Sequence, residues 1–118
     1  MKKAVKLLRL FRRKNPFDAI AFTGTSGAAL AYPLSYLLGM PLICVRKSIR
    51  DNHFGSKLEG LVSAKKYIIV DDFIESGKTI NRITRSIKSE NKKAKCVGIY
   101  LYDQSFKIDS PFENIPVI

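Results

Sequence analysis

The 118-residue sequence lacks any uninterrupted apolar run of the length that a membrane-spanning helix needs, about 20 residues. It also lacks a signal-peptide core, because charged residues interrupt the segment Val5 to Phe11 that follows the basic N-terminus. These absences argue against the membrane and secreted classes. We expect a soluble cytoplasmic protein that has no membrane partner.

Cysteine is scarce as well, and histidine occurs once. Cys44 and Cys96 both fall inside apolar runs, and neither has the CxxC or Cys/His spacing of a metal site. We therefore expect two buried free thiols rather than metal ligands.

Acidic residues are outnumbered: 10 Asp and Glu stand against 21 Lys and Arg, for a formal charge of +11. Such a surface field favours phosphorylated ligands or nucleic acid as partners. The basic residues gather in two runs, from Lys2 to Lys14 and from Arg82 to Lys95. Each run is equally compatible with a solvated helix face and with a nucleic-acid surface.

The length fits a single domain, residues 1–118, with one continuous core. Residues 1–16 predict a basic N-terminal helix. Short apolar runs predict four strands, at Ala19 to Thr23, Leu42 to Val45, Tyr67 to Val70 and Cys96 to Tyr102. Helical patterns lie at Ala28 to Leu38, where Pro33 would kink the helix or delay its start, and at Lys78 to Ser89. This alternation predicts an α/β fold, a mostly parallel twisted sheet with flanking helices.

Two segments show no strong period. Residues 46–66 are polar and contain two glycines, and a loop of that length in a small domain is usually functional or disordered. Residues 104–118 are too apolar for a free tail. We expect a flexible loop at 46–66 and a short tail or hood at 104–118 that packs near the sheet edge.

Two adjacent carboxylates, Asp71 and Asp72, end the third predicted strand, and Ser76-Gly77-Lys78-Thr79 follows at the start of a helix. Carboxylates at a strand end can hold vicinal ribose hydroxyls, or Mg²⁺ through water. The turn offers backbone N–H groups, two hydroxyls and a helix N-terminus, which together can cradle one phosphate. Gly77 lets the backbone approach that phosphate closely.

Two other interpretations of this segment fit less well. A nucleotide-triphosphate P-loop needs glycine at position 72, where the chain has Asp72, whose carboxylate would repel a polyphosphate. An ordinary strand-turn-helix junction would explain Ser76 and Thr79 as capping residues. It would not explain two consecutive carboxylates at the end of a buried strand.

The segment VDDFIESGKT, Val70 to Thr79, resembles the signature of the type I phosphoribosyltransferases, and weaker resemblance extends over roughly residues 18–102. It implies the fold of that family with a minimal hood. Asp71 and Asp72 would bind the ribose hydroxyls and Mg²⁺ and take part in catalysis. The resemblance assigns the 5′-phosphate of phosphoribosyl pyrophosphate to five residues: Glu75, Ser76, Gly77, Lys78 and Thr79.

The resemblance also implies a pyrophosphate site built from two parts of the chain. The turn Thr23 to Gly27 looks like the family's pyrophosphate loop, and Arg46 and Lys47 would add positive charge there. We expect Thr25, Ser26 and Gly27 to present exposed backbone N–H groups in that turn.

The segment Arg46 to Gly60 is similar to the flexible catalytic loop of orotate phosphoribosyltransferases. Arg50 and His53 would stabilise the departing pyrophosphate. Arg50 stands where lysine is usual, and His53 only approximates the family position. Glu75 lies where 6-oxopurine enzymes of the family carry an acid near the base, so it could accept a proton.

The nucleobase is left open between two classes. The loop resembles that of orotate enzymes, whereas Glu75 and Lys78 resemble the hypoxanthine-guanine phosphate loop. Tyr102 and Asp103 occupy the position after the last strand that faces the base in the latter enzymes, where a lysine is usual. Tyr100 and Phe106 are further aromatic candidates for stacking, although strand aromatics are more often core residues.

The resemblance implies a Mg²⁺-dependent phosphoribosyltransferase that acts on phosphoribosyl pyrophosphate and a nucleobase as a homodimer. The alternative is a non-catalytic regulator of the same fold that senses the phosphoribosyl group and binds nucleic acid. The net charge favours the regulator, whereas Arg46, Lys47 and the long loop favour the enzyme.

Overall fold

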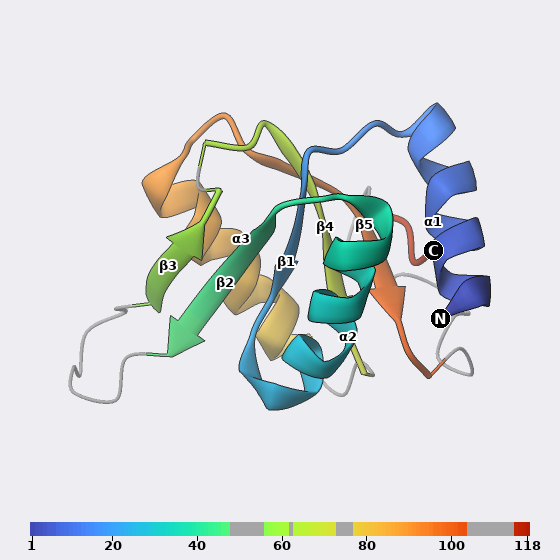
Figure 1. The fold of residues 1–118 in the computed structure, drawn as a ribbon. Helices are drawn as coiled ribbons and strands as arrows, with labels where there is room; N and C mark the ends of the chain where they lie inside the picture. The colour runs from blue at the N-terminus through green and yellow to red at the C-terminus, as the bar shows by residue number, and fades with distance from the viewer. Residues whose placement is uncertain (48–55, 62, 73–76, 104–114) are drawn as a thin grey trace.

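The computed structural model describes residues 1–47, 56–61, 63–72, 77–103 and 115–118. Three helices and five strands occur in the described part: α1 (Lys2–Lys14), β1 (Ala19–Phe22), α2 (Gly24–Leu38), β2 (Leu42–Lys47), β3 (Ser56–Gly60), β4 (Lys66–Asp71), α3 (Lys78–Glu90) and β5 (Lys95–Leu101). The strands form one sheet in the order β3-β2-β1-β4-β5 (Figure 1). β1, β2, β4 and β5 run parallel, and β3 is antiparallel to β2. The predicted α/β class with a mostly parallel sheet is confirmed.

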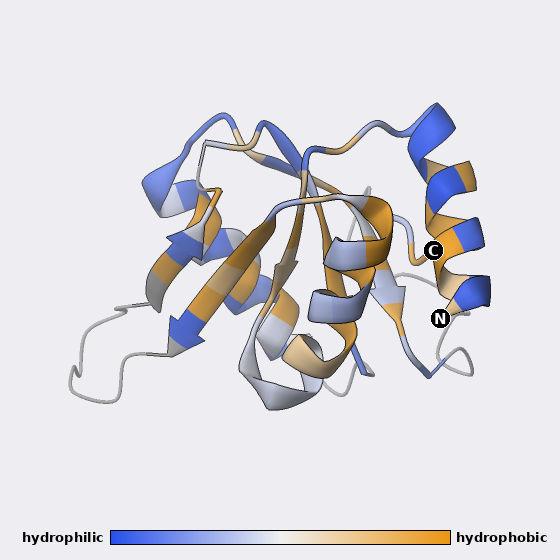
Figure 2. Ribbon diagram, in the orientation of Figure 1, coloured by the Kyte–Doolittle hydropathy of each residue, from blue (hydrophilic) through white to orange (hydrophobic). Residues whose placement is uncertain are grey.

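The sheet is covered on both faces, which explains why its strands are apolar throughout. Ile68 and Val70 of β4 join one core cluster with side chains of α1 and α2, whereas Tyr67 and Ile69 join a second cluster with α3. Figure 2 shows the apolar strands between these helical layers. Because successive side chains alternate between faces, Asp71 continues the row that faces α3.

The helix after β1 begins earlier than the sequence suggests. We expected a turn at Thr23 to Gly27 and a helix that Pro33 kinks or delays. The helix is not delayed, because α2 runs from Gly24 and contains Pro33. Thr23 is extended and forms the N-cap. The burial of Leu30 and Leu34 against the sheet outweighs the backbone hydrogen bond that proline removes.

The expected flexible loop at 46–66 is wrong at both of its ends. β2 continues through Arg46 to Lys47, and β3 pairs with it in the register Lys47↔Ser56. Leu58 packs against the α3 side of the core, and Arg46 Nε lies 3.4 Å from Glu59 Oε2. This strand could not be predicted from the sequence pattern, because its segment contains only one large apolar residue, Leu58, next to charged residues. Residues 48–55 lie outside the described part.

The C-terminal residues pack beside β5, as expected for the tail. The N–H of Ile99 donates to Pro116 O at 3.0 Å, and the N–H of Ile118 donates to Ile99 O at 2.7 Å. The Ile118 side chain is buried in the core with α1 and α2. The remainder of the expected hood, residues 104–114, is not among the described residues.

Both cysteines are free, as predicted. Cys96 is buried, and burial raises the pKa of its thiol to about 12, so it stays protonated and unreactive. Cys44 is only half-buried. No helix in the described part of the chain is long and apolar enough to cross a membrane.

The end of β3 yields a stability prediction. Gly60 has φ +106°, and a Cβ there would overlap the carbonyl oxygen of Leu42. Gly60→Ala should therefore lower the free energy of unfolding by about 3 kcal/mol, from left-handed strain and backbone overlap together. Gly39→Ala is the matched control, because Gly39 has φ +64° with no atom within 4 Å of the added Cβ. It should cost only about 1 kcal/mol in urea unfolding, and equal losses in the two variants would contradict the overlap.

Candidate functional site

The carboxyl ends of β1, β2 and β4 lie side by side and place the predicted site residues at one edge of the sheet. Phe22 of β1 pairs with Cys44 of β2, and Ala21 pairs with Ile69 of β4. Thr23, directly after β1, donates a hydrogen bond through Oγ1 to Val45 O at 2.6 Å. This edge is where ligands bind in parallel α/β sheets.

Asp71 is a buried carboxyl at this edge, with 7% of its surface exposed. Its Oδ1 accepts the backbone N–H of Asp72 at 2.9 Å. The pKa of Asp71 is raised to about 6, chiefly by burial and also by hydrogen bonding and charge from the Asp72 side chain. The Asp72 N–H and the Arg82 guanidinium act in the opposite direction. A carboxyl whose pKa is raised by burial at the carboxyl ends of parallel strands is a candidate for a functional site.

The predicted phosphate turn leads into the N-terminus of α3. Gly77 is the N-cap, with the left-handed backbone angles φ 79° and ψ −3°. Its carbonyl accepts the N–H of Asn81 at 3.0 Å, so the N–H groups of Lys78, Thr79 and Ile80 precede the first intrahelical bond. These three donors can hold a phosphate at the positive end of the helix dipole. Glu75 and Ser76 of the same turn lie outside the described residues.

A second helix N-terminus opens at the same edge. The predicted pyrophosphate residues Thr25, Ser26 and Gly27 form the first turn of α2 instead of a loop. Thr25 and Ser26 are exposed, whereas Gly27 is buried where an added Cβ would lie 3.3 Å from Phe22 Cβ. Their backbone N–H groups are thus presented by a helix, which orders them more firmly than a turn would.

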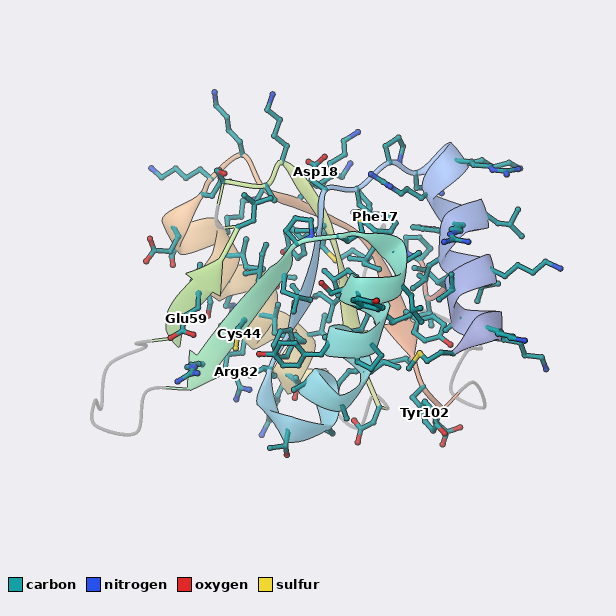
Figure 3. The ribbon with its side chains drawn as sticks, in the orientation of Figure 1. Phe17, Asp18, Cys44, Glu59, Arg82 and Tyr102 are labelled. Carbon is teal, nitrogen blue, oxygen red and sulfur yellow. The ribbon has the colours of Figure 1, made fainter. Side chains whose placement is uncertain are left out.

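Arg82 is the residue of this site that sequence reasoning missed. Its Nη2 donates to Thr23 Oγ1 at 3.2 Å, and its buried Nε has no hydrogen-bond partner among the described residues. Figure 3 labels this side chain near the carboxyl ends of the strands. Arg82 was counted only as part of a basic run. Its one sequence signal is its place between the buried Ile80 and Ile83.

The residues expected to face the nucleobase, Tyr102 and Asp103, lie beside the acidic pair. The N–H of Tyr102 donates to Asp71 O, and the N–H of Asp103 donates to Asp72 O, both at 2.9 Å. Tyr102 is 71% exposed, so its ring is available to a ligand. Tyr100 is buried in the core and not available for stacking. Phe106 lies outside the described residues.

The basic side chains expected around pyrophosphate are only partly described. Arg46 is exposed near the end of β2, where it faces Glu59 on the neighbouring strand. Lys47 is the last residue of β2. Arg50 and His53 lie outside the described part of the chain, so their predicted roles stay predictions.

A family model described as "Phosphoribosyl transferase domain" matches residues 2–104. The chain belongs to this family. Among its curated relatives, the orotate phosphoribosyltransferase of Pyrobaculum islandicum is 34% identical over 74 residues, which are 62% of this chain and 38% of the relative. That of Listeria monocytogenes serotype 4b is 30% identical over 83 residues, 70% of this chain and 39% of the relative. This phosphoribosyl transferase domain therefore spans less than half the length of these relatives.

Solved structures share the fold. The orotate phosphoribosyltransferase of Aeropyrum pernix aligns with a TM-score of 0.64 and 19% identity, covering 85% of this chain and 56% of that one. The adenine phosphoribosyltransferase of Saccharomyces cerevisiae aligns with a TM-score of 0.65 and 17% identity, covering 99% of this chain and 76% of that one. Both belong to enzymes named for phosphoribosyl transfer, which agrees with the type I fold inferred from VDDFIESGKT.

The donor set of the site fits Mg²⁺ in one particular way. Among the described residues, no group of three or more His, Cys, Asp or Glu side chains could form a complete metal cage. Mg²⁺ is commonly held by one or two carboxylates together with substrate phosphates and water. The carboxylates of Asp71 and Asp72 would suit an ion held jointly with a phosphorylated ligand.

The raised pKa of Asp71 predicts how stability depends on pH. Since its folded-state pKa of about 6 exceeds the ordinary value of 3.8, the folded protein holds this proton more tightly between those pH values. The Asp71 contribution to the free energy of unfolding is therefore complete below about pH 4. It is lost as the pH rises through about 6.

Asp71→Asn should remove this loss, so the stability of the variant relative to wild type should rise between pH 4 and pH 7 in urea unfolding. Asp72→Asn is the control and should retain most of the fall, because burial is the main cause of the Asp71 shift. A difference between wild type and Asp71→Asn that does not change with pH would contradict the assignment.

Proposed function

We propose that this chain transfers the 5-phosphoribosyl group from phosphoribosyl pyrophosphate to a nucleobase nitrogen and releases pyrophosphate. The observation that carries the proposal is the arrangement at the end of β4. There the buried Asp71 and the adjacent Asp72 lie between two helix N-termini, those of α2 and α3. Two carboxylates suit a hydroxylated sugar or its metal ion, and two helix N-termini suit phosphates on either side of it.

Each part of the site has a role in this reaction. The α3 N-terminus, with Gly77, Lys78 and Thr79, binds the 5′-phosphate. Asp71 and Asp72 hold the ribose hydroxyls and Mg²⁺, which neutralises charge on the pyrophosphate. The α2 N-terminus and the basic end of β2 receive the leaving group. The protein positions the reactants and stabilises charge as the bond at C1 of the sugar breaks.

Orotate is the first base to test, because the two curated relatives described above are orotate phosphoribosyltransferases. Tyr102 and Asp103 are the proposed base-facing residues, since their backbone bonds hold them against the acidic pair. The Asp103 carboxylate would accept a hydrogen bond from an amino or imino group of a base, but it would repel the carboxylate of orotate. Purines are therefore the second class of base to test. Homodimer formation and the catalytic roles of Glu75, Arg50 and His53 belong to the same proposal.

The test is calorimetric titration with phosphoribosyl pyrophosphate and Mg²⁺, followed by measurement of pyrophosphate release with orotate, uracil, adenine, hypoxanthine, guanine and xanthine. Binding with release for one base would support transfer and name the acceptor. Binding without release would favour the phosphoribosyl sensor instead. Absence of binding would overturn the site.

Two substitutions test the same binding site. Asp72→Asn should weaken binding of phosphoribosyl pyrophosphate with Mg²⁺ by at least ~100-fold, about 3 kcal/mol, because a charged ligand group is lost. Gly77→Val should do the same, since a branched side chain would fill the phosphate cradle. Gly39→Val is the matched control: Gly39 has the same left-handed conformation at the far end of α2. Equal affinity losses at Gly77 and Gly39 would show strain rather than lost ligand contacts.

Arg82 is the proposed positioning residue of the site. It holds Thr23, the N-cap of α2, through the hydrogen bond to Thr23 Oγ1, and it adds positive charge near Asp71. Arg82→Met should weaken binding of phosphoribosyl pyrophosphate by about 10-fold, about 1.4 kcal/mol, because the α2 N-terminus loses this support. Arg82→Lys should recover part of the affinity through its charge.

Stability separates this role from a structural one. Since Arg82 Nε is buried without a partner, Arg82→Met should leave the free energy of unfolding unchanged or raise it. Arg85→Met, an exposed arginine on the same helix, is the control and should change neither quantity. A loss of stability in Arg82→Met that matches the loss of affinity would make Arg82 a core residue only.

A further inference from the structure

A continuous group of exposed basic side chains lies at the amino ends of the parallel strands, away from the proposed catalytic site. We call this group the basic edge, and all of its members are exposed. It consists of Arg12, Arg13, Lys14, Lys65, Lys66, Lys92, Lys93 and Lys95. In Figure 2 the hydrophilic end of α1 and the hydrophilic turns before β4 and β5 lie along one side of the molecule.

Backbone hydrogen bonds join the segments of the basic edge. The N–H of Asp18, four residues after α1 ends, donates to Lys66 O at 2.7 Å, and the N–H of Lys95 donates to Lys65 O at 2.8 Å. Asn91 Nδ2 donates to Ala64 O at 2.9 Å and holds the turn before β5 against the start of β4. Three segments far apart in the sequence are thus fixed as one surface.

The basic edge carries an excess of positive charge within the described part of the chain. No side chain of the group forms an ion pair with a described residue. The carboxylate of Asp18, labelled at this edge in Figure 3, accepts the backbone N–H groups of Lys65 and Lys66 through Oδ2 at 3.2 Å each, and its charge offsets one of the eight positive charges. Glu90 lies at the border, as the last residue of α3.

The basic edge and the proposed catalytic site lie at opposite ends of the same strands. β4 begins at Lys66 and ends at Asp71, so about 17 Å of extended strand separates them at 3.3 Å per residue. One phosphoribosyl pyrophosphate cannot contact both ends. The basic edge therefore needs another anionic partner.

We propose that the basic edge binds the phosphate backbone of a nucleic acid. A row of lysine ammonium groups on exposed turns matches a regularly charged polymer, which needs no pocket. Of the large exposed apolar side chains among the described residues, Leu10 and Leu61 are the nearest in sequence to members of the edge, and they come from different segments. A membrane anchor or a protein interface requires a cluster of such side chains. Because the exposed aromatic residues of the described part, Tyr32, Tyr36 and Tyr102, do not belong to the segments of the edge, contact with phosphates rather than with bases is expected.

The experiment is a fluorescence anisotropy titration of the full chain with a mixed-sequence RNA single strand of about 20 nucleotides, and with a DNA duplex of the same length. Wild-type protein should bind at least one of the two at about 50 mM salt, and the affinity should fall by about 100-fold at 200 mM if about four phosphates are contacted. Absence of binding at low salt overturns the proposal.

The triple variant Lys65→Glu, Lys92→Glu, Lys93→Glu tests whether the nucleic acid binds at the basic edge. Its affinity should fall at least ~10-fold, and the slope of log affinity against log salt should decrease by about three. The matched control, Lys2→Glu, Lys3→Glu, Lys6→Glu, has the same net charge but changes exposed residues at the other end of α1. It should bind within about 3-fold of wild type, and equal losses in both variants would overturn the proposal.

Two further measurements complete the test. Both triple variants should bind phosphoribosyl pyrophosphate as wild type does, which shows that they are folded and that this interface is independent of the proposed catalysis. If the wild-type protein does not bind phosphoribosyl pyrophosphate either, circular dichroism of the variants checks their folding instead.

Two competing partners are tested in the same way. Phosphatidylserine vesicles, and separately soluble polyglutamate, should each bind the wild-type protein more weakly than RNA or DNA does at the same salt concentration. Tighter binding of either one would replace the nucleic acid with a membrane or an acidic protein.

Discussion

The burial of the Asp71 carboxyl at the end of β4 constrains the rest of the site. Asp71 follows the buried side chains of Tyr67 to Val70 in β4, so ionisation of its carboxyl is opposed by burial and assisted by the Asp72 N–H and the nearby Arg82. Arg82 in turn holds Thr23, and Thr23 is bonded to the end of β2. One costly carboxyl is thereby linked to the ends of three strands and to the start of α2. The buried carboxyl lowers the stability of the fold, and in return the groups at this edge are held in place, as is common at functional sites.

The two ends of the parallel sheet have different electrostatic characters. At the carboxyl ends, Asp71, Asp72 and Asp103 lie near the N-terminus of α3 and the partly buried Arg82, so charges of both signs occur there. At the amino ends, lysines of three segments meet without described ionic partners. The formal charge of +11 is therefore not spread evenly. An excess that looks like a general property of the sequence is concentrated by the fold on a surface remote from the proposed chemistry.

Much of the fold could be predicted because its signals are local. The apolar runs around Ile20 and Ile69 became buried parallel strands, and the spacing of Ile80, Ile83 and Ile87 became the buried face of α3. The missed strand Ser56–Gly60 shows where such reasoning fails. It is held by backbone pairing with β2 and by one leucine, and pairing between distant segments leaves little trace in a local pattern.

The sequence by itself determined the family, the acidic pair and the predicted phosphate turn, because the order strand, two carboxylates, glycine and helix N-terminus is a contiguous arrangement. Only the tertiary structure decided that Arg82 belongs to the site, since its partner Thr23 lies 59 residues away. It also decided that Tyr102 and Asp103 lie against Asp71 and Asp72, through bonds between neighbouring strands. The grouping of Lys14, Lys65 and Lys93 at one edge likewise follows from sheet order. Contacts between distant segments depend on how strands pair and pack, and no single stretch of sequence encodes that pairing.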